Sequence, residues 1–168
     1  MNAKINDFAA LSYFASINKE NKLLKNNRFF FSRVTGLGNM EEVIQTYKKS
    51  PAYFCVDDTN EEHTLQGGSG GYFERRMYTV FILHRYDMKS MSSQSEKLNL
   101  CRNIYSQICS KLINDKRNGK SGLTFLKTDR IPFYELEGYA LNGVTGLYFM
   151  FNIEKPINLC YDANQWEK

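Results

Sequence analysis

The chain has 168 residues, of which 42% are hydrophobic and 24% charged, so it is long enough for one domain with its own core. Its formal net charge is only +4 and its basic residues are scattered, which argues against a dedicated nucleic-acid-binding protein. No run approaches the roughly 18 apolar residues of a membrane span, and the N-terminus lacks the apolar stretch of a signal peptide. We therefore expect a protein made and kept in a cytoplasm, without membrane contact.

The first 50 residues are expected to form a mainly helical segment. Residues 6–24 carry apolar side chains near helical spacing, and Asp7 or Asn6 is placed to cap this helix. The three consecutive phenylalanines at Phe29–Phe31 suit either a short buried strand or an anchoring loop.

A second short helix is expected over residues 39–50. Asn39 would cap its start, and Glu41 and Glu42 would lie in its first turn, where the helix dipole favours negative charge. Pro51 would end it, because proline disfavours helical backbone in the residue before it.

Residues 52–58 and 72–86 are predicted to be strands. Ala52, Phe54 and Val56 alternate onto one face of the first strand, and the polar residues 59–66 then lead the chain out of it. The second strand is apolar on both faces in its middle, which is typical of a strand at the centre of a sheet.

The clearest helix is predicted over residues 92–116. Ser93 and Glu96 match the S-x-x-E capping box at its start, and the helix stoppers of 118–122 follow its end. The apolar side chains that share one face at helical spacing are Leu98, Cys101, Tyr105, Ile108 and Leu112.

Two more strands and a tail complete the chain. Residues 123–138 alternate but contain Pro132, which predicts a bent or edge strand. Residues 143–155 place Leu147, Phe149, Phe151 and Ile153 on one face, and Pro156 is expected to end this strand. The tail carries Cys160, Tyr161 and Trp166, which we expect to cover the core or a partner.

The order of these elements predicts an α+β fold. We expect a mostly antiparallel sheet of about four strands, one long helix across a face, N-terminal helices and a projecting β-hairpin. Residues 1–168 would form a single domain, with a helical segment over 1–50 and the α+β core over 51–168.

The glycine-rich stretch at Gly67–Gly71 does not predict a phosphate-binding loop. It precedes a strand, whereas a phosphate loop needs a following helix whose N-terminus faces the anion. Asn114–Ser121 nearly matches a P-loop, but a helix precedes it and a strand follows, which is the reverse of the required order. Both stretches are interpreted as turns.

The four cysteines give no metal or redox motif. Cys55, Cys101, Cys109 and Cys160 include no C-x-x-C pair, so we expect reduced and mostly buried thiols. Cys101 and Cys109 fall on one helix and cannot reach each other. A nucleophilic pair of Cys55 with His84 across neighbouring strands is conceivable, but it would need an exposed thiol with a low pKa.

A metal-dependent nuclease or other DNA-processing enzyme is the alternative that the carboxylates leave open. It would use Asp57, Asp58, Glu74 and His63, with Glu135 as a further candidate. These residues lack the register of a calcium loop and the E-x-K pattern of many nucleases. The sequence therefore predicts no enzyme, no cofactor and no metal site.

Contact with other proteins remains the best-supported role. The aromatic content is high, at 14%, and tyrosine and arginine are enriched at interfaces. A glycine-tipped hairpin can reach a neighbouring subunit and adapt as it docks. The candidate assembly contacts are Gly67, Gly68, Gly70, Gly71, Tyr72, Arg75, Arg76, Arg85, Tyr161 and Trp166.

From about Pro51 to Trp166 the layout resembles that of tail-terminator and head-tail neck proteins of tailed bacteriophages. The matching pieces are "PAYFCVDDT", "YFERRMYTVFILHRYD", "SEKLNLCRNIYSQICSKLI", "GVTGLYFMFNI" and "CYDANQW". These are a strand with its polar loop, a long strand, a sheet-covering helix, a closing strand and a tail. The resemblance is one of layout, and it leaves the N-terminal helix and the triple phenylalanine unplaced.

The resemblance implies a virion structural protein made in the bacterial host. Such a protein forms a ring with copies of itself and joins head to tail, or caps a tail tube, without catalytic residues. Its partners would be adjacent virion proteins of the tail tube, connector or portal, and DNA would pass through the ring lumen. A host adaptor that binds another protein through the same hairpin is a further alternative.

Overall fold

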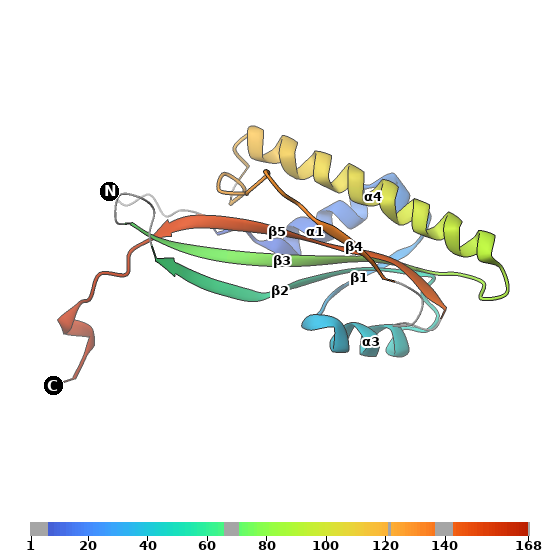
Figure 1. The fold of residues 1–168 in the computed structure, drawn as a ribbon, viewed down its shortest axis with the longest axis horizontal. Helices are drawn as coiled ribbons and strands as arrows, with labels where there is room; N and C mark the ends of the chain where they lie inside the picture. Colours follow the sequence, from blue (N-terminus) through green and yellow to red (C-terminus); the bar gives the residue numbers. More distant parts are fainter. Residues whose placement is uncertain (1–6, 66–70, 121, 137–142, 168) are drawn as a thin grey trace.

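The fold is built around a β-sheet whose central strand is paired with a neighbour on both sides along its length. The structure is a computed structural model that describes residues 7–65, 71–120, 122–136 and 143–167, without the side chains of 61–65. Its sheet has the strand order β1-β2-β3-β5-β4 (Figure 1). The strands are β1 Phe29–Arg33, β2 Ala52–Leu65, β3 Tyr72–Arg85, β4 Phe133–Leu136 and β5 Val144–Ile157.

Helices lie on both faces of this sheet. They are α1 Ala10–Glu20, α2 Lys22–Asn26, α3 Gly36–Thr46 and α4 Met91–Arg117, and a short 3-10 helix, η1 Ala163–Gln165, lies in the C-terminal tail. Figure 1 shows α1 and α4 on one face and α3 on the other. The predicted α+β class, with a mostly antiparallel sheet and one long helix across a face, is confirmed.

The described sheet has five strands rather than about four, because the triple phenylalanine forms β1. This strand pairs in parallel with β2, from Phe29 opposite Ala52 to Arg33 opposite Val56. Parallel neighbours need a crossover connection, and α3 provides it. The first 50 residues therefore contribute an edge strand as well as helices.

β2 is longer than predicted, since the polar residues 59–65 continue it instead of leading out of it. They pair with β3 as far as Leu65 opposite Tyr72, after an irregularity between Asp57 and Asn60 that inserts one extra residue. Such a bulge bends a strand and increases its twist. The sequence pattern did not reveal this half of the strand, because its residues are mostly polar.

The main core lies between the sheet and the helices α1 and α4. Tyr78, Val80 and Ile82 of β3 face it, and the predicted apolar faces of β2 and β5 do so as well. From α4, the buried apolar residues are Cys101, Ile104, Ile108 and Leu112. The periodicity predictions for these strands and for the buried part of the α4 face are thus confirmed.

A smaller core lies under α3 on the opposite face. Met40, Val43 and Ile44 of α3 pack on side chains of the sheet that include Tyr53, Cys55, Phe81, Leu83 and Val144. Because β3 is buried on both faces in this region, the prediction that it is the central strand is confirmed.

The predicted caps of the first two longer helices are wrong. α1 begins only at Ala10, and Asp7 instead forms an ion pair with Lys155 of β5. α3 begins at Gly36, so Asn39 lies inside it and accepts a hydrogen bond from the backbone N–H of Thr35 at 3.1 Å.

The capping box predicted for α4 is also replaced. The helix begins one turn earlier than Ser93 implies, and the Ser90 hydroxyl accepts the backbone N–H of Ser93 at 3.2 Å. Sequence reasoning chose the wrong serine because Ser90, Ser92, Ser93 and Ser95 all precede the apolar face.

Pro156 lies inside β5, opposite Phe73, rather than ending the strand. Glu154, two residues earlier, donates its N–H to the carbonyl of Phe125, away from β3, at 3.2 Å. Groups two residues apart in a strand point the same way, so the nitrogen of Pro156 also points away from β3 and costs no ladder hydrogen bond. Of the strand predicted over residues 123–138, the described part forms only β4, after Pro132; β4 is an edge strand, as expected, since it is the last strand of the sheet.

A buried carboxylate joins α1 to α4. Asp115 is fully buried and accepts hydrogen bonds from the Tyr13 hydroxyl at 2.9 Å and from Lys111 Nζ at 2.5 Å, while Lys120 Nζ lies 3.1 Å from its other oxygen. Burial alone would raise the pKa of Asp115, but the bonds from Lys111, Tyr13 and Lys120 outweigh it and lower the pKa.

We predict that Asp115→Asn lowers the free energy of unfolding by about 2 kcal/mol at pH 7, because the three donors lose a charged acceptor. A lowered folded-state pKa stabilises the protein above the ordinary carboxyl pKa, and this stability is lost as the pH falls through the folded-state value. The difference between variant and wild type should therefore shrink below about pH 4. Urea titrations at several pH values measure it, with exposed Asp129→Asn as the control.

We predict that Gly146→Ala strongly destabilises the protein. Gly146 of β5 has φ +150°, and a Cβ there would lie 2.1 Å from the carbonyl oxygen of Ile82 in β3. Because that atom belongs to the backbone of the central strand, the loss should be about 3 kcal/mol or more. Gly38→Ala in α3, where a Cβ meets nothing within 4 Å, should be neutral or slightly stabilising in the same thermal unfolding experiment.

Candidate interaction surfaces

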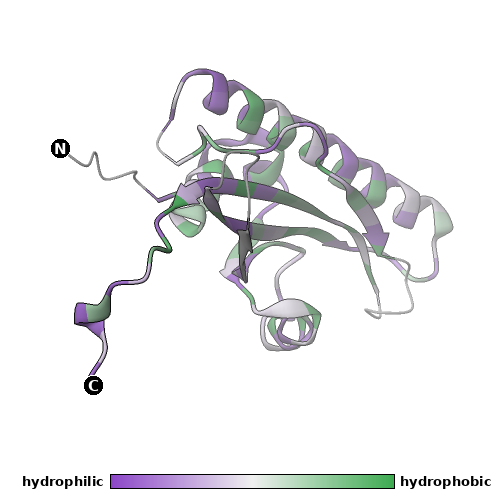
Figure 2. Cartoon of the chain, turned by 60° about the vertical axis from the view of Figure 1, so that its left-hand side comes forward, coloured by the Kyte–Doolittle hydropathy of each residue, from purple (hydrophilic) through white to green (hydrophobic). Residues whose placement is uncertain are grey.

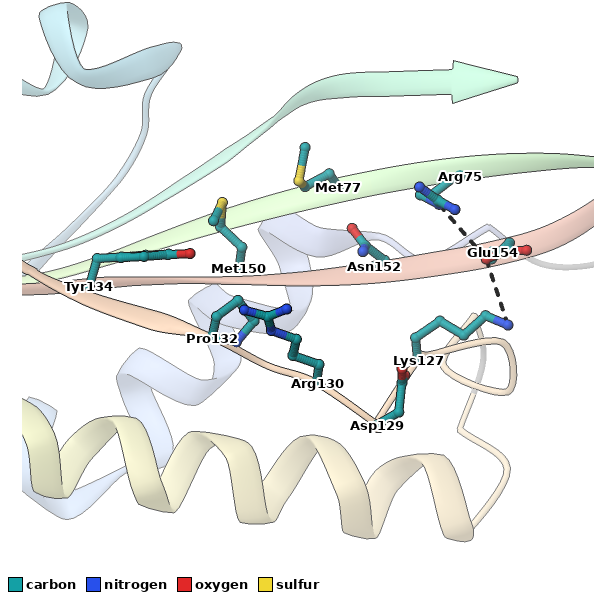
Figure 3. Close-up of a pocket in the computed structure, with 10 residues that line it drawn as sticks. All are labelled: Arg75, Met77, Lys127, Asp129, Arg130, Pro132, Tyr134, Met150, Asn152 and Glu154. Atoms are coloured by element: carbon teal, nitrogen blue, oxygen red, sulfur yellow. Dashed lines mark ion pairs between the residues drawn. The ribbon is translucent and has the colours of Figure 1, made fainter. Parts of the chain in front are cut away.

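The sheet face that carries α3 is only partly covered by it. Beyond this helix, the outward side chains of β3 and β5 and the segment 127–134 surround an open groove of about 510 Å³ (Figure 3). Its lining residues are Arg75, Met77, Lys127, Asp129, Arg130, Pro132, Tyr134, Met150, Asn152 and Glu154. Strand alternation explains the members from β3 and β5, because they lie on the face opposite core residues such as Tyr78, Phe149 and Phe151.

The groove has an apolar floor. Met77 of β3 and Met150 of β5 line it from neighbouring strands in diagonal positions, and Tyr134 of β4 stacks on Tyr148 with ring centroids 5.3 Å apart. Met77 is 38% exposed and Tyr134 is 46% exposed, so this part of a sheet face remains in contact with solvent. Exposed methionine and tyrosine side chains on a sheet are typical of a binding surface.

Charged side chains surround this floor at one end. Glu154 lies 3.8 Å from the Arg75 guanidinium and 3.6 Å from Lys127 Nζ, and so joins β3, β5 and the 127–134 segment (Figure 3). Arg130 and Asp129 are exposed nearby. Three cations and two carboxylates line the groove, so its lining has a small positive net charge.

The glycine-rich tip lies mostly outside the described residues. Gly67, Gly68 and Gly70 fall there, whereas Gly71 is exposed and Tyr72 is partly buried. Tyr72 pairs with Leu65 of β2 on one side and with Ile157 of β5 on the other. The predicted hairpin is therefore the outer part of a three-stranded ribbon rather than an isolated two-stranded arm.

The two neighbouring arginines of the ribbon lie on opposite faces. Arg75 lines the groove, while Arg76 faces the side of the α1 helix and lies 3.4 Å from Glu74. On that side, Lys155 bridges Glu74, at 3.3 Å, and Asp7. Of the pair, only Arg75 can contact a molecule bound in the groove.

Arg85 binds within its own chain. Its guanidinium donates to the carbonyls of Ser50 at 3.1 Å and Ile44 at 3.0 Å and to the Tyr53 hydroxyl at 2.6 Å. It also lies over the Tyr53 ring at 5.5 Å from the centroid. This candidate assembly contact thus links the end of α3 to the sheet.

The C-terminal tail does not cover the described core. Tyr161 and Trp166 are 75% and 66% exposed, and they stack on each other with ring centroids 6.2 Å apart. In Figures 1 and 2 the tail runs away from the sheet. The expectation that the tail covers the core is wrong. The expectation that it contacts a partner stays a prediction.

The carboxylates of the nuclease alternative are not brought together. Each one is paired with a different partner, and the side chain of His63 lies outside the described part. The pairs are Asp57 with the backbone N–H of Gly36, Asp58 with Arg33, Glu74 with Arg76 and Lys155, and Glu135 with Arg102. Among the residues that the structure describes, no three His, Cys, Asp or Glu side chains form a group that could hold a metal.

Cys55 and His84 lie on opposite faces of the sheet. Ala52, not Cys55, is opposite His84 in the register, and His84 packs on Phe29 while Cys55 lies in the core under α3. Burial raises the pKa of the Cys55 thiol to about 12, which keeps it protonated at neutral pH. Cys55, Cys101, Cys109 and Cys160 are all free thiols, and only Cys160 is exposed.

The sequence matches no protein-family model and no curated protein. Within the described residues, no helix is both long enough and apolar enough to cross a membrane.

Sequence reasoning found Arg75 but missed the rest of the groove. The other lining residues are Met77 of β3, the segment 127–134, which was predicted to belong to a bent or edge strand, and the face of β5 opposite its core residues, to which the sequence pattern assigned no role. A signal was present: Tyr148 and Met150 alternate with the core residues of β5, so this strand carries apolar side chains on both faces.

We predict that Arg85→Ala lowers the free energy of unfolding by about 2 kcal/mol, because two carbonyls and a tyrosine hydroxyl lose their donor. Arg85→Lys should recover only part of this stability, since an ammonium group cannot match the planar fork of a guanidinium. Urea unfolding measures both, with Arg75→Ala in the groove as the matched control. Equal losses at the two arginines would contradict the structural role of Arg85.

Proposed function

We propose that this protein is a virion structural protein of a tailed bacteriophage, a subunit of a tail-terminator or neck ring that joins the phage head to the tail. It acts by self-assembly and by contact with adjacent virion proteins, such as those of the tail tube, connector or portal. Its place of action is the virion, after synthesis in the host bacterial cytoplasm. In this role it needs no catalytic residues and no cofactor.

The observation that carries the proposal is the groove on the open sheet face. It combines an apolar floor of methionine and tyrosine with arginines, which is the composition that protein interfaces favour. The arrangement of long ribbon, helix and closing strands also agrees with the layout resemblance from Pro51 to Trp166.

The two alternatives differ in what they need from these surfaces. A nuclease needs carboxylates that converge on a metal, whereas Asp57, Asp58 and Glu135 each pair separately with other groups of the chain. A host adaptor, which would bind another protein through the hairpin, would engage that partner instead of building a ring.

We predict that the purified protein forms a closed ring with one subunit number, either alone or when mixed with tail components. Native mass spectrometry and negative-stain microscopy measure the subunit number directly. Ring formation is expected because one face that binds a different face of the next copy closes into a ring when the rotation permits. A strict monomer under both conditions would contradict the proposal.

A further inference from the structure

The C-terminal tail is an exposed segment with the chemistry of a ligand. After β5 ends at Ile157, the described hydrogen bonds and ring contacts of residues 158–167 all lie within the tail itself. The Asp162 side chain accepts the backbone N–H of Asn164 at 3.0 Å and so caps the turn η1. This turn brings Tyr161 and Trp166 into one stacked pair.

The stacked pair gives the tail a large apolar surface. Leu159, Tyr161 and Trp166 are all exposed, and aromatic side chains of this size contribute strongly to binding when they become buried. The tail is weakly acidic, because it carries two carboxylates, Asp162 and Glu167, and one cation, Lys168.

The groove is complementary to this tail. The groove has an apolar floor of Met77, Met150 and Tyr134, and its lining has a small positive net charge. An acidic segment with an aromatic pair would place its rings on the methionines and its carboxylates near Lys127 and Arg130 (Figure 3).

We propose that the tail of one copy binds in the groove of a second copy of this chain. The tail leaves β5 at the end of the ribbon and runs away from its own sheet in both views, which directs it toward a neighbour (Figures 1 and 2). Each copy has one tail and one groove, so the contact joins two different surfaces and propagates from copy to copy. Such a contact can close into a ring. This inference rests on the proposed homo-oligomeric function and supplies the contact that would hold the ring together.

The single tryptophan makes the inference directly testable. Trp166 is the only tryptophan of the chain, so its fluorescence reports the environment of the tail alone. We expect its emission to shift to shorter wavelength as the protein concentration rises, in parallel with the mass of the assembly measured by light scattering. The shift is expected because the indole ring leaves water when it enters the groove.

Exchange of charges between the two surfaces tests which groups meet. The double variant Lys127→Glu with Arg130→Glu, and separately Asp162→Lys with Glu167→Lys, should each weaken association about tenfold or more, and the four changes together should restore much of it. The matched control is Lys48→Glu with Lys49→Glu, which reverses two exposed charges away from the groove and should leave association unchanged. Circular dichroism checks that each variant is folded.

Four results would overturn the inference. A short-wavelength emission that does not depend on concentration would place the tail in the groove of its own chain. If rings form while Trp166 stays exposed to water, the tail is not part of the contact between copies, although the proposed ring function still holds. Equal weakening by the control pair would reduce the effect to net charge. Failure of the wild-type chain to associate under any condition would remove the ring function as well.

Discussion

The structure depends on β3, a strand that is paired on both sides over its full length and buried on both faces in its inner half. Burial of this inner half requires a helix layer above and below it, and α1 with α4 on one side and α3 on the other supply them. Two features hold neighbouring elements against this strand. β5 approaches it closely at Gly146, and Arg85 at its end binds the end of α3 and Tyr53 of β2. Outside its inner half, β3 has no second layer of helices on the α3 side, within the residues that the structure describes.

The absence of that layer shapes the surface that we propose to be functional. The side of the ribbon nearer α1 is covered in part by Phe8, which packs on Tyr78 and Phe151. On the opposite side, the groove exposes Met77 and Tyr134 and leaves Met150 partly exposed. The groove leaves apolar side chains such as Met77 and Tyr134 in contact with solvent, and their burial against another molecule would stabilise a complex. The same reasoning applies to the exposed aromatic pair of the tail.

Much of the fold could be predicted from the sequence wherever burial of one face makes apolar residues recur at the spacing of a helix or a strand. The faces of β2, β3 and β5 and the long helix followed from alternation and helical spacing, because these elements carry most of the core. Helix starts were missed where several capping residues compete, as in the serines before α4. The groove could not be assembled from sequence, because Met77, Met150 and Tyr134 come from three segments that only the strand register brings together.

Hydrogen–deuterium exchange, measured on the assembled and the dissociated protein, tests the central claim most directly. We predict that assembly slows exchange in two places, the segment 127–134 beside the groove and the C-terminal tail at 158–167. The outward face of α4, which includes Arg102 and Ser106, should exchange equally fast in both states. Protection confined to α4, with none at the groove or the tail, would contradict the claim that the open sheet face is the assembly surface.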